Sequence, residues 1–283
     1  RDLNNPGDSE CQTLTFDGPF DDTPFRMIHD GQALWVAAGG WDVRFSPTSS
    51  GRGVFRFEDG QWSTYEKQFF PELLGRDINS SFDDVRNVVG VGRNPVTGEV
   101  WGTTYLEGAF TIDPETEEII VYDEVNSSLQ FALGETPGRV RVGNVDFDDF
   151  GNTYLSNPTA ANGDPYSVRD GDGEWIALGG NCNKNEAFDI LVDDAGYVWQ
   201  LHGTQSGNGI SVHDPAGTIF DTSDDRCRDI IASNSDLPTN EVYSMALDLD
   251  GDVWIGSGQG IIIFECGTEV FNTALCNGRR PVV

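Results

Sequence analysis

The stretch that decides the fold is LPTNEVYSMALDLDGDVWIGSGQGIIIFE, from Leu237 to Glu265. It contains three apolar runs of strand length, Val242 to Leu247, Val253 to Ile255, and Ile261 to Phe264. The breaks between the runs carry Asp and Gly, which tolerate the backbone angles of tight turns. Short apolar runs separated in this way predict antiparallel strands joined by hairpins.

The same unit recurs upstream in four imperfect copies. Each copy places an aromatic residue in its second run, and these marker residues recur at intervals of roughly fifty residues: Trp35, Trp101, Tyr154, Trp199 and Trp254. A further DG or DP turn predicts a fourth strand, as at Asp59-Gly60 before Trp62 and at Asp214-Pro215 before Ile219. Repeated four-stranded units predict an all-β propeller over residues 1–283, with the marker aromatics in the core between blades. A β-sandwich is the alternative, but sandwiches do not repeat in this way.

The two ends of the repeat array resemble each other. Glu10 to Phe16 and Glu265 to Phe271 share Glu, Cys, Thr and Phe at the same spacing, and both fall where an outermost fourth strand is expected. The sequence therefore predicts five blades and one orphan outer strand. Because many propellers have more than five blades, we expect the chain to be truncated at both ends, with further blades elsewhere.

Charge and hydropathy exclude several kinds of partner. The chain of 283 residues has 47 acidic and 17 basic residues and a formal charge of -30. Such a surface repels nucleic acid and anionic lipid head groups. No apolar run reaches the length of about 18 residues that a transmembrane helix needs. The chain also opens at Arg1 without a signal peptide, which we interpret as processing or truncation.

Five cysteines point to disulfides rather than to zinc. No pair has C-x-x-C spacing and only three His are present, so a zinc site is not expected. The strand map places Cys182 and Cys227 in the linkers before the fourth and fifth blades, and Cys266 and Cys276 around the last outer strand. We predict the disulfides Cys182–Cys227 and Cys266–Cys276, with Cys11 unpaired, and hence an oxidising compartment. Five buried free thiols are the alternative.

The longest loops fall on one face of the predicted propeller. Loops between second and third strands open on the same face as linkers between blades, and the long ones cover residues 39–52, 66–84, 156–165, 203–208 and 222–241. Long loops on one side of a rigid scaffold are where binding usually resides. The sequence therefore predicts a ligand or partner surface on this loop face.

Six residues are candidates for that surface. Trp41 in the first long loop either stacks on a sugar ring or a protein partner, or packs within the loop. Three arginines near the same loop are the preferred contact for an anion, with pairing to surface carboxylates as the alternative: Arg44, Arg52 and Arg56. Tyr105 and His202 end second strands, where they either line the loop face or pack at the strand end.

Other motifs suggest metal binding or catalysis only weakly. Asp248, Asp250 and Asp252 resemble half a calcium loop but lack its distal Glu, and they fall where a hairpin turn is required, as do Asp146 to Asp149. We interpret them as turns, with Ca²⁺ as the weaker alternative and no other cofactor. The histidines can each act as a base, but no paired nucleophile accompanies them, so the sequence favours a non-enzymatic protein.

The pattern N-x-V-x-x-x-x-x-D-x-D-G-x-V-W-I-G-[ST]-x-x-G, from Asn240 to Gly260, resembles the two-component-regulator propeller repeat. Such repeats form periplasmic sensor modules of hybrid histidine kinases in Bacteroidetes and the propellers of the PorZ family, surface components of type IX secretion systems. Leu34 to Trp41 and Cys276 to Pro281 resemble the PorZ family in particular. The resemblance implies a cell-surface scaffold that binds lipopolysaccharide, another glycan or a protein partner. A periplasmic sensor propeller and a propeller hydrolase or lyase are the alternatives.

Overall fold

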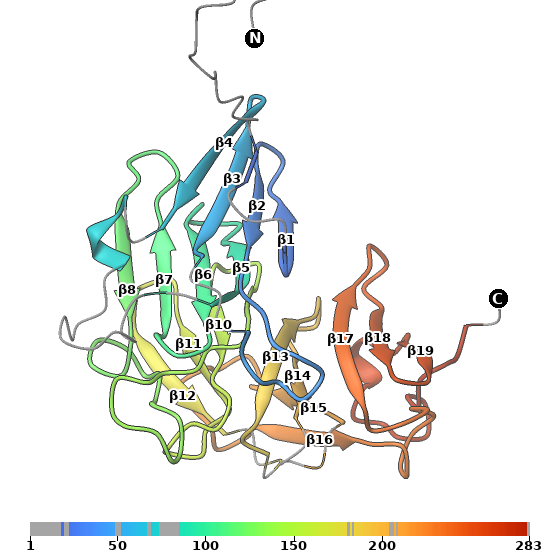
Figure 1. The fold of residues 1–283 in the computed structure, drawn as a ribbon. Helices are drawn as coiled ribbons and strands as arrows, with labels where there is room; N and C mark the ends of the chain where they lie inside the picture. The colour runs from blue at the N-terminus through green and yellow to red at the C-terminus, as the bar shows by residue number, and fades with distance from the viewer. Residues whose placement is uncertain are drawn as a thin grey trace, which may run out of the picture.

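The computed structural model describes residues 23–48, 52–66, 69–73, 87–179, 184–203 and 209–281, together with residues 18, 19, 85, 182 and 207. Apart from short 3₁₀ turns, the regular structure of these residues is β-strand (Figure 1). The orphan strand expected at residues 10–16, with Cys11, lies outside the described residues. No helix in this part of the chain is both long and apolar enough to span a bilayer.

The strands form five consecutive antiparallel sheets, which we number as blades 1 to 5. Blade 1 consists of β1 Arg26–His29, β2 Leu34–Ala37, β3 Val54–Glu58 and β4 Gln61–Tyr65. Blade 2 consists of β5 Val88–Arg93, β6 Val100–Thr104, β7 Ala109–Ile112 and β8 Ile119–Tyr122. Blade 3 consists of β9 Val145–Phe147, β10 Thr153–Ser156, β11 Tyr166–Arg169 and β12 Trp175–Leu178. Blade 4 consists of β13 Ala187–Val192, β14 Val198–His202, β15 Ile210–Asp214 and β16 Arg226–Ile230, and blade 5 of β17 Val242–Leu247, β18 Val253–Ser257 and β19 Gly260–Phe264.

An aspartate fixes the first hairpin of most blades. In blade 4, Asp193 Oδ1 accepts hydrogen bonds from the amides of Ala195 and Tyr197, and Oδ2 accepts one from the indole of Trp199 at 2.8 Å. The same side chain thus closes the turn and orients the marker aromatic. Asp30, Asp148 and Asp248 make equivalent contacts in blades 1, 3 and 5. This device explains why an Asp recurs five or six residues before the marker aromatic.

The marker aromatics are inter-blade core in four blades, as predicted, but not in the fifth. Trp35, Trp101, Tyr154 and Trp199 are all buried, and the following blade covers each of them. Trp254 remains 36% exposed, because no described sheet packs on its side of blade 5. The prediction that Trp254 is core is therefore wrong for this part of the chain.

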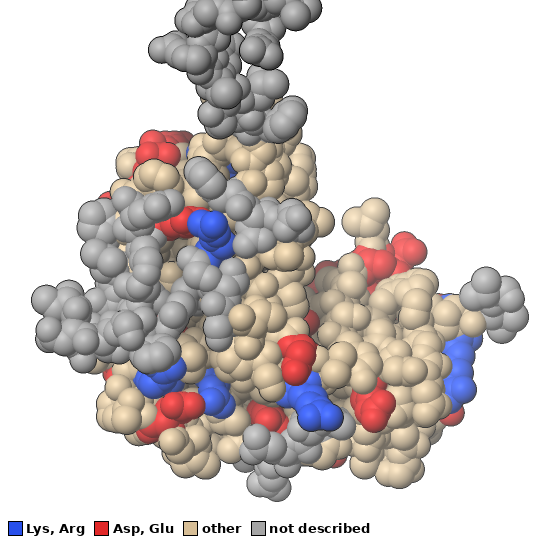
Figure 2. Space-filling model, viewed as in Figure 1, with Lys and Arg blue, Asp and Glu red and all other residues tan. Residues whose placement is uncertain are grey.

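The five blades surround a common axis, with their first strands innermost. Figure 1 shows β17 of blade 5 facing β1 of blade 1 across an opening, and Figure 2 shows a notch at the same place. Blades 1 to 4 each pack directly on the next one, whereas blades 5 and 1 stand on the two sides of the notch.

Two outer strands differ from the prediction. The fourth strand of blade 4 is β16, not a segment near Ile219, because the chain turns after Pro215 and pairs again only from Arg226, whose guanidinium binds Asp214. In blade 5, residues 267–269 form a 3₁₀ turn instead of a strand. The outer position there is taken by Arg279, which exchanges backbone hydrogen bonds with Ile263.

Both predicted disulfides are present, Cys182–Cys227 and Cys266–Cys276. Cys227 lies within β16 rather than in the linker that was expected to carry it. Its bond to Cys182, with an ion pair between Lys184 and Asp229 at 2.7 Å, holds the β12–β13 linker against this outer strand. An edge strand covered in this way cannot pair with another chain.

Candidate functional site

The central channel of the propeller contains a hollow. A cavity of 770 Å³ lies between the first strands β1, β5, β9 and β13, with Met245 of β17 on its rim. It reaches the first hairpin turns of blades 1 and 2, and therefore opens on the face opposite the long loops. Ligand sites in proteins are typically concavities of about 300–1,000 Å³. The channel is therefore the candidate site.

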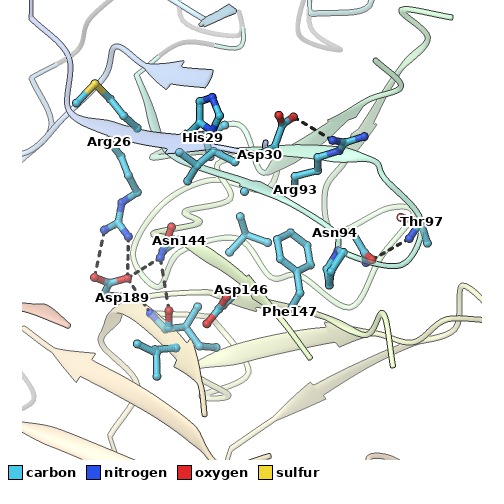
Figure 3. A pocket seen from close by; sticks show the side chains of 18 of the residues that line it. Arg26, His29, Asp30, Arg93, Asn94, Thr97, Asn144, Asp146, Phe147 and Asp189 are labelled. Atoms are coloured by element: carbon cyan, nitrogen blue, oxygen red, sulfur yellow. Dashed lines mark hydrogen bonds and ion pairs between the residues drawn. The ribbon is translucent and has the colours of Figure 1, made fainter. Parts of the chain in front are cut away.

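A polar network crosses the channel from blade 1 to blade 4. The guanidinium of Arg26 binds both carboxylate oxygens of Asp189, at 3.2 and 3.1 Å, and Asn144 donates to the same carboxylate at 2.7 Å (Figure 3). Such two-point pairing holds the guanidinium plane in one orientation. The network therefore presents fixed donors and acceptors to the cavity.

Asp146 adds a second carboxyl group to the channel wall. Its Oδ2 accepts a hydrogen bond from the amide of Val192 at 2.7 Å. Burial, reinforced by the neighbouring charge of Asp189 and only partly offset by amide hydrogen bonds, raises the pKa of Asp146 to about 6. The carboxyl group thus changes its charge in a mildly acidic range.

Replacing Asp146 with asparagine should stabilise the fold at neutral pH. Because the folded pKa lies above the ordinary value of 3.8, this carboxyl group contributes stability below pH 3.8 that is lost as the pH rises through about 6. Asparagine keeps the hydrogen bond from Val192 without the charge, so we expect a gain of about 2 kcal/mol at pH 7 and no gain below pH 4. Urea denaturation at both pH values measures the difference. An equal effect of Asp146→Asn at both would contradict the raised pKa.

The remaining walls combine hydrogen-bonding groups with apolar surface. Asp30 and Arg93 form an ion pair at 3.2 Å beside the rim, and Asn94 caps its own turn by accepting from the amides of Val96 and Thr97. The Phe147 ring lies beside Asn94 (Figure 3). Donors, acceptors and an aromatic ring around one hollow suit a ligand with many hydroxyl groups.

The loop-face end of the axis is filled by aromatic side chains. Trp41 and Phe45 from the β2–β3 loop pack with Tyr105 of blade 2 and Phe188 of blade 4, and the Phe45 and Phe188 rings stack at 4.1 Å. Phe45 adopts a left-handed backbone with φ of 59°, which a large residue tolerates only when its surroundings hold it there. The β2–β3 loop is therefore a packed plug across the axis.

Three predicted binding residues are buried or partly buried in the structure. Trp41 is partly buried among four aromatic rings, so it packs within the loop rather than standing free for a ligand. Tyr105 is buried and donates to the carbonyl of Phe45 at 2.7 Å. Tyr105 also forms part of the wall of a 390 Å³ hollow on the loop face. His202 is fully buried against Ser211, so it does not line the loop face.

The three candidate arginines have three different surroundings. Arg44 lines a 390 Å³ hollow on the loop face with Arg141, Glu135 and Glu186. Arg52 pairs with Glu66 at 3.5 Å.

Arg56 lies between blades 1 and 2, where it covers the Trp35 ring and donates to the carbonyl of Pro114. These contacts show that Arg52 and Arg56 each bind other residues of the fold. They favour this interpretation over a joint anion site.

Asp248 and Asp148 close hairpin turns as predicted, but Asp146 does not, because it lies within β9 and lines the channel. Asp248 accepts hydrogen bonds from the amides of Asp250 and Asp252 and from the indole of Trp254, and these bonds lower its pKa. No group of three or more metal-binding side chains is present among the described residues.

His213, one of the possible bases, is buried between blades 3 and 4 beside Tyr166 and Asp225. Its burial lowers its pKa.

Comparison with solved structures extends these findings. PorZ, an essential bacterial surface component of the type IX secretion system of Porphyromonas gingivalis, superposes with a TM-score of 0.79 at 21% identity, over 96% of this chain and 36% of that chain. The chain shares the propeller fold of PorZ. The extracellular domain of a hybrid two-component system of B. thetaiotaomicron superposes with a TM-score of 0.59 at 17% identity, over 91% of this chain and 31% of that chain.

A propeller enzyme is also similar in fold. Virginiamycin B lyase from Staphylococcus aureus superposes with a TM-score of 0.54 at 11% identity, over 93% of this chain and 86% of the lyase. At such identities the likeness establishes the fold alone. The chain spans about a third of PorZ and of the two-component domain. No family model and no curated protein sequence matches the chain.

Apart from Asp146, which was assigned to a turn, the channel residues were not singled out from the sequence, although a signal for them exists. Arg26, Asn144, Asp146 and Asp189 each interrupt an apolar run in the first strand of a repeat or just before it. A polar residue at that position of a propeller repeat faces the axis, and the repeat register identifies it.

Proposed function

We propose that this chain is the propeller region of a secreted or cell-surface, non-enzymatic scaffold that binds a glycan in its central channel. The observation that carries the proposal is the 770 Å³ cavity walled by fixed polar groups from blades 1 to 4. The likeness to PorZ, a bacterial surface component, and the two disulfides, typical of an oxidising compartment, support the location.

The charge of the channel selects the kind of sugar. Its lining holds the carboxyl groups of Asp30, Asp146 and Asp189 against the guanidinium groups of Arg26 and Arg93. A surface with this excess of acid, on a chain of charge -30, disfavours phosphorylated or other anionic groups. The channel therefore suits neutral sugars, such as the uncharged residues of a lipopolysaccharide chain. A ligand-sensing propeller of a hybrid receptor is the alternative use of the same cavity.

Replacing Arg26 with glutamine tests this assignment. Loss of the guanidinium frees the Asp189 carboxylate to move and removes donors from the channel wall, so we expect the affinity for a neutral oligosaccharide to fall at least about tenfold. A glycan array with the unmodified chain identifies the saccharide, and isothermal titration calorimetry measures both proteins.

Arg169→Gln is the matched control. Arg169 is similarly exposed and also pairs with a carboxylate, that of Glu99 at 3.6 Å, but it lies outside the channel. Equal affinities of both variants would overturn the channel assignment. Conversion of the saccharide during the titration, followed by mass spectrometry, would instead establish a hydrolase or lyase.

A further inference from the structure

One carboxyl group of the channel has no positive partner among the described residues. Asp30 pairs with Arg93 at 3.2 Å, and Asp189 binds two nitrogens of the Arg26 guanidinium. Asp146 forms no ion pair with any residue that the structure describes. In Figure 3, dashed lines reach Asp30 and Asp189 but not Asp146. Within the described channel wall, the negative charge of Asp146 is therefore the one left without a counter-ion.

Ionisation of Asp146 costs the folded protein stability. Burial raises the pKa of Asp146 to about 6, so at neutral pH this carboxyl group is ionised in surroundings that disfavour its charge. The hydrogen bond from the amide of Val192 does not explain the charge, because an asparagine oxygen accepts such a bond equally well. A destabilising charge in a cavity is typical of a site where the ligand supplies the missing interaction.

The space beside Asp146 also favours a cation. A second hollow, of 400 Å³, adjoins the channel and shares Asp146, Phe147 and Leu191 with its wall. It lies between the first hairpin turns of blades 3 and 4. Its described lining contains four more aspartates and no Lys or Arg: Asp148, Asp149, Asp193 and Asp194. A positive group near Asp146 is attracted by all of these charges, whereas an anion is repelled.

We propose that the saccharide bound in the channel carries a protonated amine, as glucosamine does, and that Asp146 binds this ammonium group. The inference rests on the proposed glycan site and narrows its substrate class, since the exclusion of anionic groups admits amino sugars as well as neutral ones. A hydrogen bond from an ammonium group to a carboxylate is about twice as strong as one between neutral groups. The network of Arg26, Asn144 and Asp189 then orients the hydroxyl groups of the same sugar.

Isothermal titration calorimetry with two matched saccharides tests the inference. The probes are the tetramers of glucosamine and of N-acetylglucosamine, because acetylation removes the positive charge of each amine. At about pH 6.5, where Asp146 is mostly ionised, the chain should bind the glucosamine tetramer at least about tenfold more tightly. Equal affinities would contradict the inference and leave the glycan site standing, whereas no binding of either tetramer would contradict both. Tighter binding of tetralysine than of the glucosamine tetramer would make this a peptide site instead.

Two variants separate a direct contact from the general charge of this face. Asp146→Asn and Asp172→Asn each lose one negative charge, but Asp172 is an exposed residue of the β11–β12 turn outside both hollows. The preference for the glucosamine tetramer should shrink to less than about twofold in Asp146→Asn and persist in Asp172→Asn. An unchanged preference in Asp146→Asn would refute the contact. Misfolding does not explain a lost preference, because Asp146→Asn is expected to stabilise the fold.

Proton release gives an independent readout. Pairing with an ammonium group keeps Asp146 ionised, so binding of the glucosamine tetramer at about pH 5.5 should release more than about half a proton. Calorimetry in two buffers with different ionisation enthalpies measures this number, and Asp146→Asn should release none. The other charged or titratable groups of the described channel wall are Arg26, His29, Asp30, Arg93 and Asp189. Equal proton release by Asp146→Asn would assign the titration to one of these groups and contradict the inference.

Discussion

Replacing Trp199 with alanine is expected to lower the free energy of unfolding by about 4 kcal/mol, since Trp-to-Ala changes in cores cost about 3–5 kcal/mol. Trp199 is buried between blades 4 and 5, and its removal leaves a cavity beside Phe264. It also takes the indole donor from Asp193, a carboxyl group whose pKa burial already raises. Urea denaturation followed by circular dichroism measures the loss.

Trp254→Ala is the control that the repeat itself provides. The two residues occupy the same place in their blades and donate to equivalent aspartates, but Trp254 is 36% exposed. Its replacement should therefore cost less, about 2 kcal/mol in the isolated chain, because Trp254 already exposes 36% of its surface to water. Equal losses for the two variants would mean that burial between blades does not account for the stability of the marker aromatics.

The pH dependence of stability should show that the His202 imidazole is neutral in the folded protein. Burial, with a smaller effect of the nearby charge of Lys184, lowers the pKa of His202 to about 3 from its ordinary value of 6.5. The folded protein thus holds a neutral imidazole that becomes protonated on unfolding below pH 6.5. The resulting stability is fully present above pH 6.5 and is lost as the pH falls towards 3.

His202→Gln removes this dependence and keeps a side chain able to bind Ser211. Between pH 7 and pH 4 the stability of the wild type, measured relative to this variant, should fall by about 3 kcal/mol. Asp146 titrates in the same range in the opposite sense, but it is present in both proteins and cancels in the difference. Urea denaturation at several pH values provides the measurement. A constant difference across this range would show that His202 is not held neutral in the fold.

The repeat could be recognised in the sequence because its turns require particular residues. The Asp193 and Asp248 turns show why: a carboxylate that binds both the turn amides and the marker indole leaves little freedom to the residues between them. The disulfide pairs also followed from the order of the strands, although the position of Cys227 did not.

Outer strands and solvent exposure were harder to predict. β16 reads Arg-Cys-Arg-Asp-Ile, since an edge strand packs little and needs few apolar residues, so the apolar pattern pointed to Ile219 instead. Trp254 has the same local sequence whether or not a blade covers it, so its exposure is a property of its neighbours.

The candidate site depends on contacts between distant repeats. Arg26 and Asp189 are 163 residues apart, and no local pattern pairs them. The plug formed by Trp41, Phe45, Tyr105 and Phe188 likewise joins three blades, so its residues looked like an open binding surface when each repeat was considered separately.

The Arg26–Asp189 pair also affects how the protein unfolds. Blades that touch only their neighbours can fray one at a time from the ends, because their stabilities simply add. Here blade 1 cannot detach without removing the guanidinium from Asp189, which is nearly buried in blade 4, and an unpaired buried charge is costly. One contact across the axis therefore makes the unfolding of the first four blades cooperative.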